Sequence, residues 1–244
     1  MPDLDGAASR PAPPYALRSE YSAQSLLFGG ETSSSLVLSV GNLAGFNFGT
    51  VFAMVRCTKP TLSNHTILSS LEGGGAQQGL AVLVNFGKLY IALSGLSNQS
   101  TSLFDIPDEE WVAVCVSKST GNSIPIFGMK SMSRGAAWVI EEGLGAALMD
   151  RVLFPITNPI IGALNDLVSF PLLGSIGAVA VWSNISISAA VMQTLHTRAG
   201  VLAANPSSYW DLDKSMLLDN IGTSNEISRA NVFSGHRMPG SWSS

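Results

Sequence analysis

Hydrophobic and polar side chains alternate with a period of two over much of this chain. Such alternation places every second side chain on one face of an extended strand, and it predicts β-strands. In residues 36–40, Leu36, Leu38 and Val40 share one face. Residues 50–57 are apolar on both faces, which is typical of a strand that is buried on both sides of its sheet. The pattern therefore predicts a chain that is rich in β-strands.

Turns that contain glycine and asparagine separate these strands and predict antiparallel hairpins. One turn is centred on Asn85-Phe86-Gly87, where the glycine supplies the positive φ that a tight turn needs. A second turn covers residues 117–122. The strands expected beside these turns are 80–84 with 88–93, and 111–116 with 123–129. Further strands are expected at 67–71, 160–163, 175–182 and 209–212.

One helix is expected late in the chain. Apolar residues repeat there at a spacing of four, which places them on one face of a helix. These residues are Ile187, Val191 and Leu195. Ser186 or Ser188 can act as the N-cap, and the helix is expected to end near Arg198.

The order of these elements predicts an antiparallel sandwich of two sheets with one short late helix. No strand–helix–strand alternation is present, which excludes the parallel nucleotide-binding folds. Residues 1–24 are rich in proline and are expected to form an extended arm. The sandwich is expected over residues 25–213, and residues 214–244 are expected to form a polar tail.

Four stretches carry strand patterns that occur together in one known superfamily. They are Ser25–Gly30 followed by Leu36–Leu38, Phe48–Val55 followed by Thr66–Ser69, Glu110–Val114, and Leu173–Ser186. In the last segment a strand ends at a tryptophan and leads into the expected helix. In this order they resemble the concanavalin A-like lectin/glucanase superfamily, in particular its laminin-G-like and pentraxin-like modules. The resemblance covers residues 25–198 and implies an all-β, antiparallel jelly-roll sandwich.

The chain departs from this superfamily at two places. Phe127–Lys130 stands where members usually have a Tyr-x-Asp-Gly turn, and Gly177-Ala178 stands where many have an acidic residue. Both departures remove carboxylates. The resemblance therefore does not imply a calcium ion or the sugar site that depends on one.

Composition limits the classes of partner. The chain has 244 residues, of which 46% are hydrophobic and only 12% are charged. The mean hydropathy is +0.29, yet no apolar run of about 20 residues suggests a transmembrane helix. A net charge of −4 with scattered basic residues argues against nucleic acid as a partner. The low charge content suggests a surface that is covered by neighbouring subunits or is neutral.

The cysteines and the first residues of the chain indicate whether the protein is secreted into an oxidising compartment. Cys57 and Cys115 lie in expected strands and form either two reduced core thiols or one bridge. The first 15 residues are acidic and rich in proline, so no signal peptide is expected.

Catalytic chemistry finds little support. Glycoside cleavage needs two carboxylates that face one groove, whereas Asp108-Glu109-Glu110 and Glu141-Glu142 are consecutive and would point apart. The three histidines have no metal-ligand spacing. We therefore expect no enzyme activity, no catalytic residue and no cofactor.

The remaining candidate site residues are aromatic or acidic. Trp138 and Trp242 could stack on the apolar face of a sugar ring, or could instead make core or subunit contacts. Asp211 and Asp213 share a face of an expected strand, and Asp219 follows. They could bind calcium through oxygen, or they could form the polar face of an edge strand.

Two functions are compatible with these observations. We expect a non-enzymatic structural protein of a virion surface, such as a phage head decoration or tail-associated subunit, assembled in the host cytoplasm. Its partners would be other virion proteins or further copies of this chain in a homo-oligomer. The alternative is a carbohydrate-binding module that recognises host-surface glycans. Neither function involves nucleic acid or membrane insertion.

Overall fold

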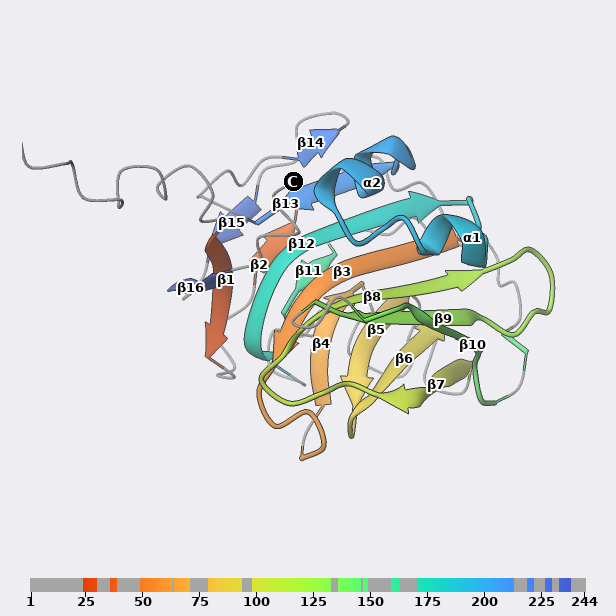
Figure 1. Cartoon of the computed structure of the whole chain (residues 1–244), viewed down its shortest axis with the longest axis horizontal. Helices are drawn as coiled ribbons and strands as arrows, with labels where there is room; N and C mark the ends of the chain where they lie inside the picture. Colours follow the sequence, from red (N-terminus) through yellow and green to blue (C-terminus); the bar gives the residue numbers. More distant parts are fainter. Residues whose placement is uncertain are drawn as a thin grey trace, which may run out of the picture.

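Two antiparallel sheets pack face to face, and two short helices lie beside the first sheet (Figure 1). The computed structural model describes residues 24–29, 36–38, 49–62, 64–70, 79–93, 98–132, 136–145, 147–148, 159–162, 171–212, 219–221, 227–229 and 233–237. This architecture confirms the predicted all-β jelly-roll sandwich.

The first sheet has nine strands. Seven of them follow the order β10-β9-β8-β3-β12-β1-β16, while β13 pairs with β12 and β14 pairs with β13. Their bounds are β1 Gln24–Gly29, β3 Gly49–Cys57, β8 Trp111–Lys118, β9 Ile126–Ser131, β10 Val139–Glu142, β12 Leu173–Ser183, β13 Ser208–Asp211, β14 Asp219–Ile221 and β16 Phe233–Arg237.

The second sheet has seven strands, in the order β15-β2-β11-β4-β5-β6-β7. Their bounds are β2 Leu36–Leu38, β4 Asn64–Ser69, β5 Leu80–Asn85, β6 Lys88–Leu93, β7 Gln99–Asp105, β11 Ile160–Ile161 and β15 Ile227–Arg229. The two hairpins expected from the turn signals are present as β5–β6 and β8–β9.

Strand β12 is the central element of the first sheet. It pairs with β3 along almost its whole length, from Gly174 opposite Cys57 to Ser183 opposite Gly49. On its other edge, β1 pairs with residues 173–176 and β13 with residues 178–181. A single strand of 11 residues thus connects three neighbours.

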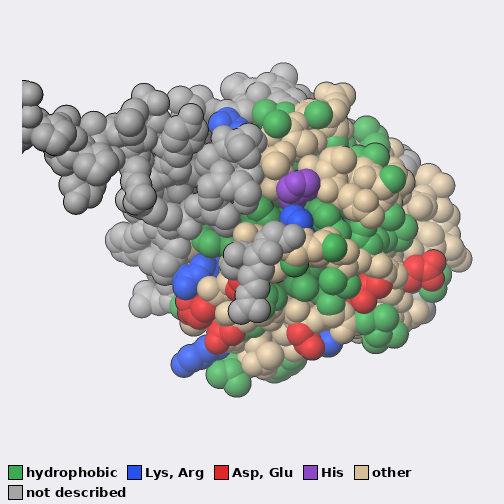
Figure 2. Space-filling view, viewed as in Figure 1, with side chains coloured by type: hydrophobic (Ala, Val, Ile, Leu, Met, Phe, Trp, Pro, Cys, Tyr) green, Lys and Arg blue, Asp and Glu red, His purple; other side chains and the backbone are tan. Residues whose placement is uncertain are grey.

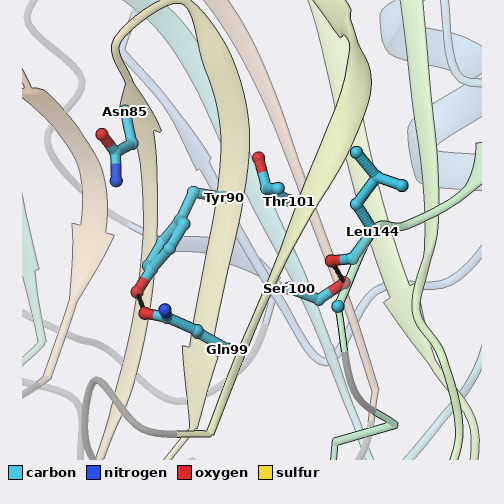
Figure 3. Close-up of a pocket in the computed structure, with 7 residues that line it drawn as sticks. Asn85, Tyr90, Gln99, Ser100, Thr101 and Leu144 are labelled. Carbon is cyan, nitrogen blue, oxygen red and sulfur yellow. Dashed lines mark hydrogen bonds between the residues drawn. The ribbon is translucent and has the colours of Figure 1, made fainter.

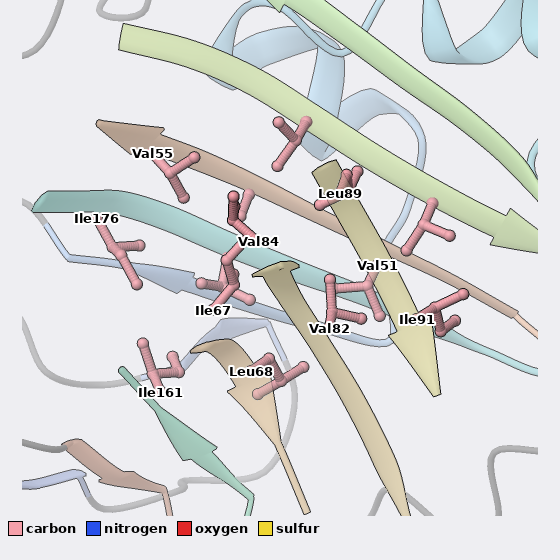
Figure 4. Packing of buried hydrophobic residues seen from close by; sticks show 14 of the residues in the cluster. Val51, Val55, Ile67, Leu68, Val82, Val84, Leu89, Ile91, Ile161 and Ile176 are labelled. Atoms are coloured by element: carbon pink, nitrogen blue, oxygen red, sulfur yellow. The ribbon is translucent and has the colours of Figure 1, made fainter. Parts of the chain in front are cut away.

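The main hydrophobic core lies between the two sheets (Figure 4). In β3 every second residue contributes to it, including Val51 and Val55, and β5 contributes Val82 and Val84. This alternation follows directly from the period of two along a strand. The inner face of each sheet is therefore apolar.

A second hydrophobic cluster covers the outer face of the first sheet. The alternate residues of β3 and β12, such as Phe52, Met54 and Trp182, point into it. The helices α1 (Ala189–Met192) and α2 (Arg198–Ala203) contribute Met192 and Val201. Residues 50–57 are therefore apolar on both faces because each face is covered, as the sequence predicts.

Buried hydroxyl groups hold the segment before α1 against the sheet. The Ile187 main-chain N–H donates to Thr50 Oγ1 at 3.0 Å and to Ser117 Oγ at 2.9 Å. The two hydroxyl oxygens lie 2.8 Å apart. Because β3 and β8 supply these acceptors, the donor that precedes α1 is satisfied inside the protein.

The single expected helix is instead two helices. α1 is capped by Ser188 as expected, but it ends at Met192 and α2 begins at Arg198, where the helix was expected to end. The Thr197 side chain accepts from the Gly200 N–H at 3.0 Å and starts the second helix. A Cβ on Gly200 would lie 2.0 Å from the Thr194 carbonyl oxygen, so this junction requires glycine.

Part of the expected polar tail contributes strands to both sheets. β14 and β16 join the first sheet and β15 joins the second. These strands have only three to five residues, and short edge strands pair through the backbone without a clear apolar pattern. The remainder of residues 214–244 and the arm over 1–23 lie outside the described residues.

Both cysteines are buried free thiols, which agrees with the reduced alternative. Cys57 belongs to the core between the sheets and Cys115 to the outer cluster, so they lie on opposite faces of the first sheet. Burial raises the pKa of Cys57 to about 12 and also raises the pKa of Cys115. Both thiols therefore stay protonated at neutral pH.

In the described part of the chain, no helix is long and apolar enough to cross a membrane.

The turn between β5 and β6 predicts a stabilising substitution. Phe86 has φ of 44° and is 62% exposed, and Gly87 has φ of 87°. A turn with two positive φ angles favours Asn-Gly, and a bulky residue is strained there. Phe86→Asn should therefore raise the free energy of unfolding by about 1 kcal/mol, measured by urea denaturation. Leu62→Asn, at a turn residue that is 71% exposed, is the control and should change little. A loss of stability in Phe86→Asn would contradict this interpretation.

His65 predicts a pH dependence of stability. The imidazole is buried on β4, and its Nδ1 accepts from the Leu173 N–H at 3.1 Å, where β12 begins. Desolvation lowers its pKa from 6.5, against an opposing hydrogen bond with the Lys59 main chain. The fold thus favours the neutral ring, and its contribution is present above pH 6.5 and is lost as the pH falls below that value.

The free energy of unfolding should therefore decrease between pH 7.5 and pH 5.5, measured by urea denaturation at each pH, a window set by the imidazole pKa of about 6.5. In His65→Gln this part of the slope should disappear, while His196→Gln, which alters a partly exposed histidine, should retain it. An unchanged slope in His65→Gln would assign the pH dependence to other groups.

Candidate functional site

A polar pocket of about 410 Å³ lies on strands β5, β6 and β7 (Figure 3). Three strands and the segment at residues 144–145 form it. Its lining residues are Asn85, Tyr90, Gln99, Ser100, Thr101, Leu144 and Gly145.

The strand pattern places the polar side chains on the outer face of the second sheet. Leu89 and Ile91 point into the core between the sheets, so Tyr90, which lies between them, points outward. Thr101 lies opposite Tyr90 in the register of β6 and β7. The pocket therefore lies on the side of the sheet that faces away from the core.

Main-chain hydrogen bonds fix the wall at Leu144. The Leu144 N–H donates to the Thr101 carbonyl oxygen at 2.7 Å, and its own carbonyl accepts from the Thr101 N–H at 3.1 Å. Ser100 Oγ donates to the same Leu144 carbonyl at 3.0 Å. Gly145 has φ of 121°, and a Cβ there would lie 3.2 Å from the Gln99 carbonyl oxygen. Glycine thus allows the chain to pass closely beside β7.

The tyrosine hydroxyl orients an amide in the lining of the pocket. Tyr90 is only 7% exposed, and its hydroxyl donates to Gln99 Oε1. Burial raises the pKa of Tyr90, so the phenol remains a protonated donor. Among the described residues the Gln99 NH₂ group has no hydrogen-bond partner, so it can donate to a bound molecule. The Thr101 hydroxyl donates a long hydrogen bond of 3.3 Å to the Leu89 carbonyl.

The described lining of the pocket is uncharged. It contains amides, hydroxyls and one leucine, and no carboxylate, imidazole, thiol or ammonium group. Tyr90 is the titratable group among these residues, and burial raises its pKa. The amides and hydroxyls can form hydrogen bonds with a neutral polar molecule.

Trp138, a candidate from the sequence, lies on the other sheet. It is partly buried and packs against the outer cluster of the first sheet. A Cβ on Gly128 would lie 3.2 Å from the Trp138 ring and 3.3 Å from Met192 Sδ, so the ring lies closely over β9 beside α1. Trp138 is thus separate from the pocket, and its role in sugar binding stays a prediction. Trp242, the second candidate, lies outside the described residues.

The three aspartates considered for calcium are described only in part. Asp211 is buried and forms an ion pair with Arg198, with Nη2 and Oδ2 2.9 Å apart. Asp219 pairs through its backbone with Trp210, and Asp213 lies outside the described residues. Within the described residues, no group of three or more His, Cys, Asp or Glu side chains could hold a metal ion.

The consecutive acidic residues have structural partners. Glu109 forms an ion pair with Arg56, and Asp108 Oδ1 accepts from the Lys59 N–H at 2.6 Å. Glu141 Oε1 accepts from the N–H groups of Leu103 and Phe104, at 2.9 Å for Phe104. These carboxylates connect strands and loops rather than facing one another across a groove.

The sequence analysis did not identify Asn85, Tyr90, Gln99 or Thr101 as site residues. Each occupies an outward position on one of three neighbouring strands. The pattern that could have indicated the pocket is a group of polar residues and one tyrosine at outward positions of adjacent strands. To recognise that group one must know the register between the strands, which the sequence alone does not provide.

No protein-family profile matches the chain. No curated protein matches it either. Similarity to known proteins is found when three-dimensional structures are compared.

Several solved structures share the fold at low sequence identity. A proposed carbohydrate-binding protein from Bacteroides ovatus matches with a TM-score of 0.56 and 15% identity over 88% of this chain. This chain spans 60% of that protein. A heptameric SAP-like pentraxin from Limulus polyphemus has a TM-score of 0.54 and 13% identity, covering 91% of this chain and 98% of the pentraxin.

A third match is tailspike protein 2 of the Escherichia coli O157:H7 bacteriophage CAB120, with a TM-score of 0.51 and 16% identity. It covers 78% of this chain and 27% of the tailspike. Identities of this size establish the architecture and leave function to the site itself. The chain has the lectin-like jelly-roll fold.

Proposed function

We propose that this chain is a non-enzymatic carbohydrate-binding protein that holds a glycan in the pocket on β5, β6 and β7. The observation that carries the proposal is the set of neutral hydrogen-bonding groups around the buried Tyr90 hydroxyl. Sugars present many hydroxyl groups, each a donor and an acceptor, to fixed amides and hydroxyls of this kind. The similarity to the proposed carbohydrate-binding protein of Bacteroides ovatus supports the same function.

The volume of the pocket also suits this function. Small-molecule sites have volumes of roughly 300 to 1,000 Å³ with a few fixed polar groups, and this pocket has about 410 Å³. Leu144 adds an apolar wall that is 50% exposed, which can contact the C–H faces of a sugar ring. The pocket therefore combines polar and apolar surfaces within one sugar-sized volume.

Removal of the Gln99 amide tests the proposal. The wild-type chain should bind at least one glycan on a glycan array, and isothermal titration with that glycan should give a measurable Kd. Gln99→Ala should weaken this Kd about tenfold, because one well-placed hydrogen bond is lost. Gln193→Ala, at an exposed residue beside α1, is the matched control and should bind like the wild type. Absence of binding to every glycan, or equal affinity of all three proteins, would refute the function.

A second candidate is the assembly subunit of a virion surface expected from the sequence. The similarity to a phage tailspike supports it. Figure 2 shows that neutral and hydrophobic groups make up much of the described surface on the face that carries the helices. Leu62 and Phe86 are 71% and 62% exposed, and Gly87 beside Phe86 approaches Thr61 beside Leu62. Exposed apolar groups gathered in this way are typical of contact surfaces.

Light scattering after size-exclusion chromatography tests this second candidate. A subunit that assembles with its own copies should elute as a homo-oligomer whose mass is a multiple of 25.6 kDa. Leu62→Ser should shift the distribution toward the monomer because it removes exposed apolar surface. A wild-type chain that stays monomeric at every concentration would contradict self-assembly.

A further inference from the structure

Phe86 occupies a turn position that does not suit a phenylalanine. It is the first residue of the turn between β5 and β6, with φ of 44°, and Gly87 follows with φ of 87°. Left-handed backbone is unfavourable for a bulky side chain, and asparagine is the usual residue at this position. The side chain is 62% exposed, so packing offsets little of the strain. A residue that breaks a local preference without a compensating contact in the fold is a candidate for contact with a ligand.

This strained turn adjoins the proposed glycan pocket. Asn85, which lines the pocket, is the last residue of β5 and pairs with Lys88 at the start of β6 (Figure 3). Phe86 therefore follows the pocket lining directly, and consecutive Cα atoms are about 3.8 Å apart. An exposed phenyl ring at this position is within reach of a sugar that contacts the Asn85 amide.

The pocket has an apolar wall on its opposite side. Leu144 pairs with Thr101 beyond β7, whereas Asn85 lies on β5, with β6 between the two strands. The hydroxyl groups of a sugar can bind to the amides and hydroxyls of the lining, while its C–H face gains from contact with an apolar surface. The ring of Phe86 supplies such a surface on the β5 side of the pocket.

From this strained, exposed ring beside a pocket-lining amide, we infer that Phe86 is a further glycan-binding residue, which stacks on the C–H face of a sugar ring at the Asn85 end of the pocket. The strain in the turn is then a loss of stability that accompanies binding function. This inference rests on the proposed glycan-binding function and adds an aromatic subsite to it.

Phe86→Asn tests the inference because affinity and stability should change in opposite directions. The full chain and its variants are compared on one array of neutral glycans that includes malto-, cello- and chito-oligosaccharides, and a concentration series gives an apparent Kd for each bound glycan. Phe86→Asn should weaken this Kd about fivefold, the ratio expected for loss of one aromatic contact. The midpoint of its urea denaturation should rise. Phe86→Tyr retains an aromatic ring and should restore most of the lost affinity.

Leu202→Asn, at an exposed leucine of α2, is the matched control and should bind like the wild type. Unchanged affinity in Phe86→Asn would overturn the inference, and a shift of that variant toward the monomer in light scattering would then assign Phe86 to self-assembly. Weaker binding together with lower stability would indicate a folding defect and would also overturn it. In these cases weaker binding by Gln99→Ala would still support the proposed function, whereas absence of binding to every glycan would refute both.

Discussion

Strands β3, β8 and β12 are apolar on both faces, and this constraint organises the molecule. Their inner side chains, such as Val55 and Val179, meet the second sheet, and their outer ones, such as Phe52 and Trp182, require a separate cover. The helices provide part of that cover because hydroxyl groups of β3 and β8 hold the chain that leads into α1. Apolar surface left in water would be costly, so the first sheet serves mainly for packing.

The second sheet is less constrained toward its β7 edge, and the pocket lies there. Its inner face packs against the first sheet. On its outer face a small buried cluster of Ala81, Leu83, Tyr90 and Ala92 lies beside the polar residues of the pocket. Tyr90 illustrates the balance, since its ring is buried while its hydroxyl orients Gln99. The strands hold the backbone in place, so the groups that line the pocket would require little rearrangement if a ligand were bound there.

The sequence predicted the sandwich because its evidence is local. Alternation along 50–57 and glycine in the turn after Asn85 act within a few residues, and both predictions are confirmed. The division of the late helix depends on the close approach of Gly200 to Thr194, which no periodicity reveals. The pocket depends on the pairing of Thr101 with Leu144, two residues that are remote in the sequence. Trp138 and Trp242 were predicted as sugar-binding residues because they lie outside the clear strand patterns. Tyr90 lies within an ordinary strand pattern, which does not distinguish it from a core residue.

The location of the glycan is the central claim, and chemical-shift mapping on the full chain tests it most directly. Titration with a glycan that the chain binds on the array, followed by the backbone amide resonances in an ¹⁵N–¹H correlation spectrum, reports which strands the sugar contacts. The account predicts that saturable shifts gather at Asn85, Tyr90, Gln99, Thr101 and Leu144. Saturable shifts confined to the helix-bearing face around Trp138 would contradict it.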